Sequence, residues 1–192
     1  MRYYKLINWN VPSADQILEL IPIPENNQAT VTPINRDIQK VILNLLKVDL
    51  DKCSDHNIML VHFPPHTQIN IHSDKPKYTK EPGKLDQAII IPLTSCDQLH
   101  WSWYEVLDES KIYHYGESAN WKMVPMVPFT AAKEIETTMC DKTFISDIGS
   151  FHALRNTSDN TAIAISIRLM PWGWEDFTTC ESLPPIEDFT LV

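Results

Sequence analysis

A long succession of short apolar or alternating runs occupies residues 58–170 and limits the folds open to this chain. Each run has the length of one strand, and prolines and other turn-forming residues separate neighbouring runs. The runs span residues 58–63, 67–72, 87–93, 99–107, 111–115, 122–127, 142–148 and 161–170. So many short strands at close spacing predict a sandwich or barrel.

Two helical patterns precede these strands, at residues 13–20 and 35–46. Ser13 is suited to cap the first helix, and apolar residues recur at helical spacing in both segments. These residues are Ile17 and Leu18 in the first segment with Ile21 just after it, and Ile38, Val41, Ile42 and Leu45 in the second. We expect both helices to pack against a sheet.

The composition favours one domain over the whole of residues 1–192. Hydrophobic residues make up 43% of the 192, which is enough for a single sizeable core. Residues 1–50 are expected to form a helical support and residues 58–170 the β core. Residues 171–192 form a C-terminal tail rich in aromatic, acidic and proline residues, which we expect to wrap the domain or mediate self-association.

The charge and the glycine content exclude several classes of function. A formal net charge of −9 argues against nucleic acid as a partner, because neutralising phosphates requires clustered lysine and arginine. With only four glycines against fourteen prolines, the chain has no glycine-rich phosphate loop, and nucleotide-dependent chemistry is not expected.

No stretch has the length of a signal-peptide core or a membrane span, so a cytoplasmic protein without a membrane partner is expected. The cysteines form no C-x-x-C pair, which favours reduced, structural thiols over a zinc ribbon or a disulfide framework. They are Cys53, Cys96, Cys140 and Cys180.

Two metal-binding residue types stand at the end of one predicted strand. A strand alternates its side chains, so His72 and Asp74, two positions apart, point to the same side and can hold one metal ion between them. His152, 80 residues later, is a candidate third ligand. Two histidines and one carboxylate form the facial triad of non-haem Fe(II) sites, which leaves open positions for a co-substrate and O₂.

Two further patterns favour a ligand site here. Gln68 and Asn70 fall on the same predicted face as His72, so that face is expected to line an enclosed polar interior. In the run at residues 161–170, one face carries small residues and ends in the cation of Arg168. A face lined by small residues leaves room for a ligand.

Three segments together carry a family resemblance. They are His72-Ser73-Asp74, the run Ala88-Ile89-Ile90-Ile91-Pro92-Leu93 followed by Trp103-Tyr104, and Phe151-His152-Ala153-Leu154-Arg155-Asn156 leading into Ile165-Ser166-Ile167-Arg168-Leu169. In this order they resemble 2-oxoglutarate/Fe(II)-dependent oxygenases, most closely the aspartyl/asparaginyl and prolyl hydroxylase-like branches with their small phage and bacterial members. The likeness covers residues 58–170.

The resemblance implies a mainly β protein with N-terminal helices, folded as a cupin-like double-stranded β-helix, or jelly roll. It implies that His72, Asp74 and His152 are the catalytic iron ligands. The implied activity is a dioxygenase that uses Fe(II), O₂ and 2-oxoglutarate to hydroxylate a side chain or a small molecule. The expected substrate is an Asp, Asn or Pro side chain of a protein, a free amino acid or a small metabolite.

The chain departs from this family at the residue that binds the co-substrate. Members usually place an arginine or lysine for the distal carboxylate of 2-oxoglutarate where this chain has Ala162. Arg168, further along the same face, and Lys84, just before the run at residues 87–93, are candidate replacements. Asn70 is the third candidate cofactor-binding residue.

Two alternatives stay open on the sequence. The first is a non-catalytic jelly-roll binding or assembly module in which His72, Asp74 and His152 satisfy one another by hydrogen bonds. The second is a cupin-type metal enzyme that recruits His66 and needs no 2-oxoglutarate.

Two other features have structural interpretations. The string of aromatic residues at positions 101–121 is a candidate substrate wall, but aromatics favour strands and fill cores, so we expect them in the core. Asn156, four positions after His152, is expected to tie the turn that follows the histidine.

Overall fold

The computed structural model describes residues 3–6, 14–46, 58–74, 87–115 and 124–169. The predicted cap Ser13, the candidate anchor Lys84 and the tail at residues 171–192 lie outside these ranges. In the part of the chain that is described, no helix has the length and apolar character needed to span a membrane.

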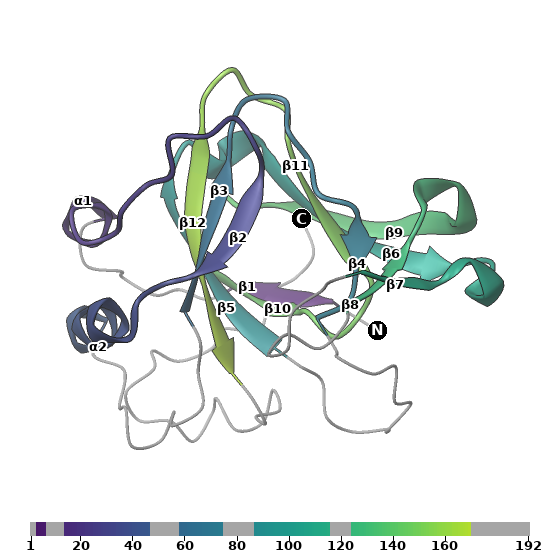
Figure 1. Cartoon of the computed structure of the whole chain (residues 1–192), viewed down its shortest axis with the longest axis horizontal. Helices are drawn as coiled ribbons and strands as arrows, with labels where there is room; N and C mark the ends of the chain where they lie inside the picture. Colours follow the sequence, from purple (N-terminus) through teal and green to yellow (C-terminus); the bar gives the residue numbers. More distant parts are fainter. Residues whose placement is uncertain (1–2, 7–13, 47–57, 75–86, 116–123, 170–192) are drawn as a thin grey trace.

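Strands dominate the described structure, and the helices are few and short (Figure 1). The strands are β1 (Tyr4–Leu6), β2 (Thr30–Pro33), β3 (Ile58–Phe63), β4 (Ile71–His72), β5 (Gln87–Thr94), β6 (Leu99–Val106), β7 (Tyr113–Tyr115), β8 (Val124–Val127), β9 (Ala132–Met139), β10 (Phe144–Asp147), β11 (His152–Asn156) and β12 (Ala162–Leu169). The helices are α1 (Ala14–Leu18) and α2 (Arg36–Leu45), with 3₁₀ turns η2 (Cys96–Gln98), η3 (Glu109–Lys111) and η4 (Phe129–Ala131).

The strands form two six-stranded antiparallel sheets. Sheet A has the order β1-β10-β5-β12-β3-β2, and sheet B has the order β7-β8-β4-β11-β6-β9. Four pairs nest inside one another along the chain: β3 with β12, β4 with β11, β5 with β10, and β6 with β9. In the order along the chain, the first strand of this set pairs with the last, the second with the second last, and so on inwards. This is the connectivity of a jelly roll. The predicted double-stranded β-helix is therefore confirmed.

The two helices cover the outer face of sheet A (Figure 1). Ile17 of α1 and Ile42 of α2 are fully buried in one cluster with Ile89 of β5 and Ile165 of β12. The Asn35 side chain caps α2 by accepting a hydrogen bond from a backbone N–H of its first turn. The expected packing of helices on a sheet is confirmed, and the same N-terminal region also adds β1 and β2 to sheet A.

A second apolar layer lies between the two sheets. Trp101 and Trp103 of β6 point into it and are 3% and 0% exposed. Tyr4 stacks on Trp103 with ring centroids 5.4 Å apart, and the Trp103 indole N–H donates to the Asp147 carbonyl at 2.9 Å. Trp101 and Trp103 are thus core residues, as expected. Tyr113 of the same aromatic string is 42% exposed on β7, an edge strand of sheet B, so the expectation is wrong there.

The predicted strands differ from the observed ones where a strand lacks a two-sided pattern. β9 is the edge of sheet B and is exposed along much of its length, including its large apolar residues Ile135 and Met139, so it has no apolar face that packs in the core. β11 is buried at every position except Arg155, so it shows no alternation. Both strands escape a search for apolar-polar periodicity.

The predicted strand at residues 67–72 is wrong in its first part. Only Ile71–His72 forms β4, and the preceding residues follow an irregular path that crosses a single bridge from Gln68 to Arg155. Gln68 and Asn70 are both exposed, so they do not form the expected enclosed polar face, although Asn70 borders a cavity. Side chains alternate between the two faces of a strand only while the backbone remains extended and paired.

Candidate metal centre

Pairing of two neighbouring strands brings the candidate ligands together. His72 of β4 lies directly opposite His152 of β11, and their ring centroids are 4.5 Å apart. Asp74 follows β4 by two residues and keeps to the same side. The potential ligand atoms of the three residues all lie within 4.8 Å of one another, so this group can hold a metal ion. The three residues singled out from the sequence thus converge on one point.

Each histidine is oriented by a backbone carbonyl. Nδ1 of His72 lies 2.8 Å from the Asn70 carbonyl oxygen, and Nδ1 of His152 lies 2.9 Å from that of Ser150. A carbonyl only accepts, so each Nδ1 carries a proton, and in the neutral imidazole the lone pair is then on Nε2. Such a bond on the far nitrogen is the usual way that proteins orient histidine for a metal.

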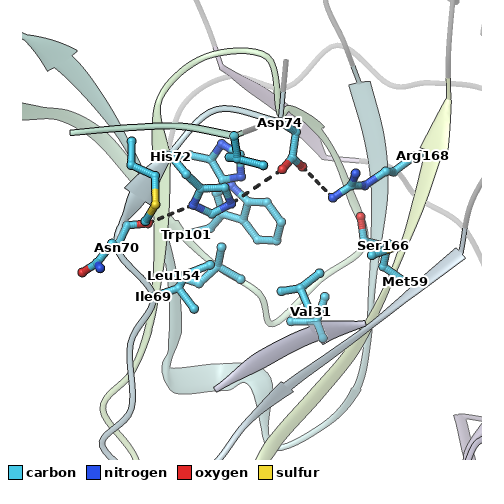
Figure 2. Close-up of a pocket in the computed structure, with 14 residues that line it drawn as sticks. Val31, Met59, Ile69, Asn70, His72, Asp74, Trp101, Leu154, Ser166 and Arg168 are labelled. Atoms are coloured by element: carbon cyan, nitrogen blue, oxygen red, sulfur yellow. Dashed lines mark hydrogen bonds and ion pairs between the residues drawn. The ribbon is translucent and has the colours of Figure 1, made fainter. Parts of the chain in front are cut away.

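Asp74 lies between His72 and Arg168 (Figure 2). Its Oδ2 accepts from Nη2 of Arg168 at 2.9 Å, and its Oδ1 lies 3.7 Å from Nε2 of His72. Burial alone raises the pKa of the Asp74 carboxyl. The positive charge of Arg168, aided by the two histidines, outweighs burial and holds that pKa below its ordinary value. Asp74 is therefore a carboxylate at neutral pH.

His152 is a neutral imidazole at neutral pH. Burial lowers its pKa to about 4, and the neighbouring His72 contributes to the shift. The indole of Trp101 stacks on the His152 ring with centroids 5.5 Å apart and planes 8° from parallel. A neutral imidazole held between a carbonyl and an aromatic plane is in the protonation state that binds metal.

A cavity of about 340 Å³ opens beside the three side chains (Figure 2). Its walls are mainly apolar, and its polar groups gather around Asp74. It is lined by Val31, Met59, Val61, Ile69, Asn70, His72, Asp74, Trp101, Val124, Met126, His152, Leu154, Ser166 and Arg168. An apolar pocket with a few convergent polar groups is typical of small-molecule sites.

Two buried donors on this lining have no hydrogen-bond partner among the described residues. They are Nε1 of Trp101 and Nε of Arg168. A buried donor without an acceptor is costly, and such groups commonly mark a position completed by a ligand or water. Both residues belong to strands that face the cavity, β6 and β12.

The structure places the other candidate residues differently. Arg168 lines the cavity as expected, whereas Asn70 contributes its backbone carbonyl to His72 and its amide points away from the ion pair (Figure 2). His66 is exposed, pairs with Asp159 at 2.9 Å and does not belong to the ligand cluster. Lys84 is not among the described residues.

Asn156 ties the turn after β11, as expected. Its amide nitrogen donates to the carbonyls of Phe63 and Asn160, and its oxygen accepts from the backbone and the hydroxyl of Ser158. The side chain is 1% exposed, so these bonds replace water almost completely. Asn156 is a structural residue that joins β3, β11 and the start of β12.

Sequence reasoning missed the turn between β10 and β11, whose backbone carbonyls contact both segments that carry the candidate ligands. Backbone acceptors carry no residue-type signal. The signal available in the sequence was Asp147 followed closely by Gly149 and Ser150, a composition typical of an aspartate-capped turn.

Comparison with known proteins gives no family assignment. No protein-family model matches the chain, and no curated protein matches it. Among solved structures, a 2OG-Fe(II) oxygenase family oxidoreductase from Burkholderia pseudomallei matches with TM-score 0.46 and 11% identity, over 81% of this chain and 76% of that one.

Two further structures show similar likeness. A prolyl-4-hydroxylase from Pseudomonas putida matches with TM-score 0.39 and 8% identity, over 88% of this chain and 92% of that one. A cupin domain from Bordetella pertussis matches with TM-score 0.36 and 11% identity, over 76% of this chain and 97% of that one. At these TM-scores, the fold assignment rests on the strand pairing of the chain itself.

Proposed function

We propose that this protein is a non-haem Fe(II)- and 2-oxoglutarate-dependent oxygenase that hydroxylates a side chain or a small molecule. The observation that carries the proposal is the convergence of His72, Asp74 and His152 on the wall of a mainly apolar cavity. Two imidazoles and one carboxylate are the donor set of the facial triad, which leaves positions open for other ligands.

The donor set fits Fe(II) in protonation as well as in type. Both histidines carry a proton on Nδ1, so each neutral imidazole offers the lone pair of Nε2 to a metal, and Asp74 is ionised. When bound, iron supplies the activation of O₂ for attack on an unactivated C–H bond. The chain supplies the orientation of the ligands and, through its apolar walls, a site with little water.

Arg168 fits the carboxylate of a 2-oxo acid. A guanidinium has five N–H donors in a planar fork, and only Nη2 is used by Asp74. Nε is buried and lacks a partner among the described residues, so an incoming carboxylate would satisfy a donor that is otherwise unmet. Ser166 stands two residues earlier on the same face of β12 and also lines the cavity.

A cupin-type metal enzyme without 2-oxoglutarate is the second candidate. The favouring observation is the ion pair itself: Arg168 is already neutralised by Asp74, which reduces its attraction for a second carboxylate. This enzyme would use the same three ligands without His66, which binds Asp159 on the surface.

The non-catalytic module has less support. It requires His72, Asp74 and His152 to satisfy one another by hydrogen bonds. The His72 to Asp74 distance of 3.7 Å exceeds a hydrogen bond, and both Nδ1 atoms bond to carbonyls instead.

Anaerobic titration with Fe(II), with and without 2-oxoglutarate, separates these functions. We expect the wild type to bind iron and to develop a visible charge-transfer band when 2-oxoglutarate is added. His72→Ala should lose both signals, whereas the matched control His66→Ala should keep them. Iron binding without the band would exclude the 2-oxo acid mechanism and favour the cupin-type enzyme. Absence of iron binding would contradict any metal-dependent function.

A further inference from the structure

The turn at residues 147–150 contacts every segment that carries a candidate ligand. The Ser150 carbonyl accepts from Nδ1 of His152 at 2.9 Å. The Ile148 carbonyl accepts from the backbone N–H of Asp74 at 3.0 Å. The third contact joins the Gly149 carbonyl to the hydroxyl of Ser73, the residue between His72 and Asp74, at 2.6 Å. Three successive carbonyls of one turn thus hold both sides of the ligand cluster.

One carboxylate holds this turn in shape. Oδ1 of Asp147 accepts from the backbone N–H groups of Gly149 at 2.9 Å and Ser150 at 3.1 Å. Its Oδ2 accepts from the Ser150 hydroxyl at 2.7 Å. Asp147 is 3% exposed, so water cannot replace these bonds at low cost. Its own carbonyl accepts from the Trp103 indole, which anchors the turn to the core.

We propose that Asp147 is a positioning residue for the candidate metal centre, acting through the carbonyls of residues 148–150. The Ser150 carbonyl selects the His152 tautomer, and the other two fix the path of the backbone from Ser73 to Asp74. The proposal rests on the metal centre of the proposed function and extends it to a residue that touches neither metal nor substrate.

Binding of Co(II) to the whole protein tests this role, because its visible absorption reports both affinity and coordination geometry. Asp147→Ala removes both acceptor oxygens and should weaken Co(II) binding about 10- to 100-fold, the usual effect of losing an outer contact to a metal ligand. It should also change the absorption spectrum. Asp147→Asn keeps one oxygen for the two N–H groups and can donate to the Ser150 hydroxyl, so it should restore most of the affinity.

Asn156→Ala is the matched control. Asn156 is similarly buried, and its side-chain oxygen also accepts from the backbone N–H and the hydroxyl of a nearby serine, but at the opposite end of β11. It should lower the melting temperature and leave the Co(II) affinity and spectrum unchanged. Equal weakening by Asp147→Ala and Asn156→Ala, or wild-type Co(II) affinity in Asp147→Ala, would overturn the positioning role and leave the metal centre standing.

Two further outcomes concern the wild type itself and the folding of Asp147→Ala. If the wild type itself fails to bind Co(II), the metal centre is overturned, and the role of Asp147 with it. If Asp147→Ala does not fold, Ser150→Ala tests the positioning role instead, because it removes only the hydrogen bond from the Ser150 hydroxyl to Oδ2 of Asp147. It should weaken Co(II) binding about 3- to 10-fold, the worth of one hydrogen bond. Wild-type affinity in Ser150→Ala would contradict the proposal.

Discussion

Arg168 of β12 and Asp74, which follows β4, form an ion pair of 2.9 Å between the two sheets of the jelly roll. The pair joins the only charged group on the described part of the β12 inner face to a candidate metal ligand. Arg168 can therefore act on the site in two ways, by keeping Asp74 ionised and by offering its remaining N–H groups to the cavity. These two roles are separable by experiment.

Arg168→Gln should weaken 2-oxoglutarate binding more than metal binding. Loss of a charge-assisted hydrogen bond is worth about 1.5–3 kcal/mol, which corresponds to roughly a 10- to 100-fold loss of co-substrate affinity. Calorimetric titration of 2-oxoglutarate into Mn(II)-loaded protein measures this affinity. Arg155→Gln is the matched control, since Arg155 is exposed on β11 and does not line the cavity. Equal affinities in Arg168→Gln and Arg155→Gln would exclude Arg168 as the anchor.

The metal-free protein should lose stability as the pH falls from about 6.5 to about 4. The pKa of His152 is lowered from 6.5 to about 4 in the folded state. Across this pH range the imidazole is therefore protonated in the unfolded chain and neutral in the folded chain, which favours unfolding as the pH falls. The contribution is roughly 3 kcal/mol over the whole window. Urea unfolding at successive pH values should show the slope, and His152→Leu should reduce it. Parallel curves for the two proteins would disprove the assignment.

Asn156→Ala should destabilise the fold without affecting the metal centre. The substitution removes the donor to the buried carbonyl of Phe63 and two acceptor contacts to Ser158, at a cost of roughly 2–4 kcal/mol in the free energy of unfolding. Urea denaturation measures this change. Asp108→Ala provides the comparison, because Asp108 caps a similar aspartate-serine turn on the surface, and its loss should cost far less. Equal losses would show that burial of Asn156 does not matter.

Ile42→Ala should test how far α2 supports the barrel. Ile42 is fully buried against sheet A, and removing a large aliphatic side chain from such a position costs about 2–5 kcal/mol. The neighbouring Val41 is 43% exposed, so Val41→Ala should change stability by about 0.5 kcal/mol or less. Thermal or urea unfolding of both variants measures these changes in stability. Similar small effects in both would mean that the helix contributes little to the core.

Much of the site was predictable because its chemistry lies in residue types. His72, Asp74 and His152 are types that bind metals, and the alternation in β12 placed Arg168 on the face that lines the cavity. The number and spacing of short strands predicted a sandwich or barrel, and the family resemblance implied a jelly roll. Pairing of β4 with β11 then supplied what the sequence could only suggest, namely that His72 and His152 stand directly opposite each other.

The unpredicted parts depend on backbone geometry and on exposure. Gln68 and Asn70 were expected inside because a regular strand was extended too far towards the N-terminus, whereas β4 holds only Ile71 and His72. β9 was missed because an exposed edge strand needs no apolar face. The orienting turn escaped notice because its acceptors are main-chain carbonyls, which every residue type provides.

The most direct test of the metal centre is the anaerobic Fe(II) stoichiometry of the wild type and of His72→Gln, Asp74→Asn and His152→Gln, measured by equilibrium dialysis. Each variant removes one of the three converging ligands while keeping a similar side-chain volume. The account predicts one Fe(II) per wild-type chain and a large loss of affinity in all three variants. A wild type that retains no Fe(II), or variants that bind it as tightly as the wild type, would contradict the account.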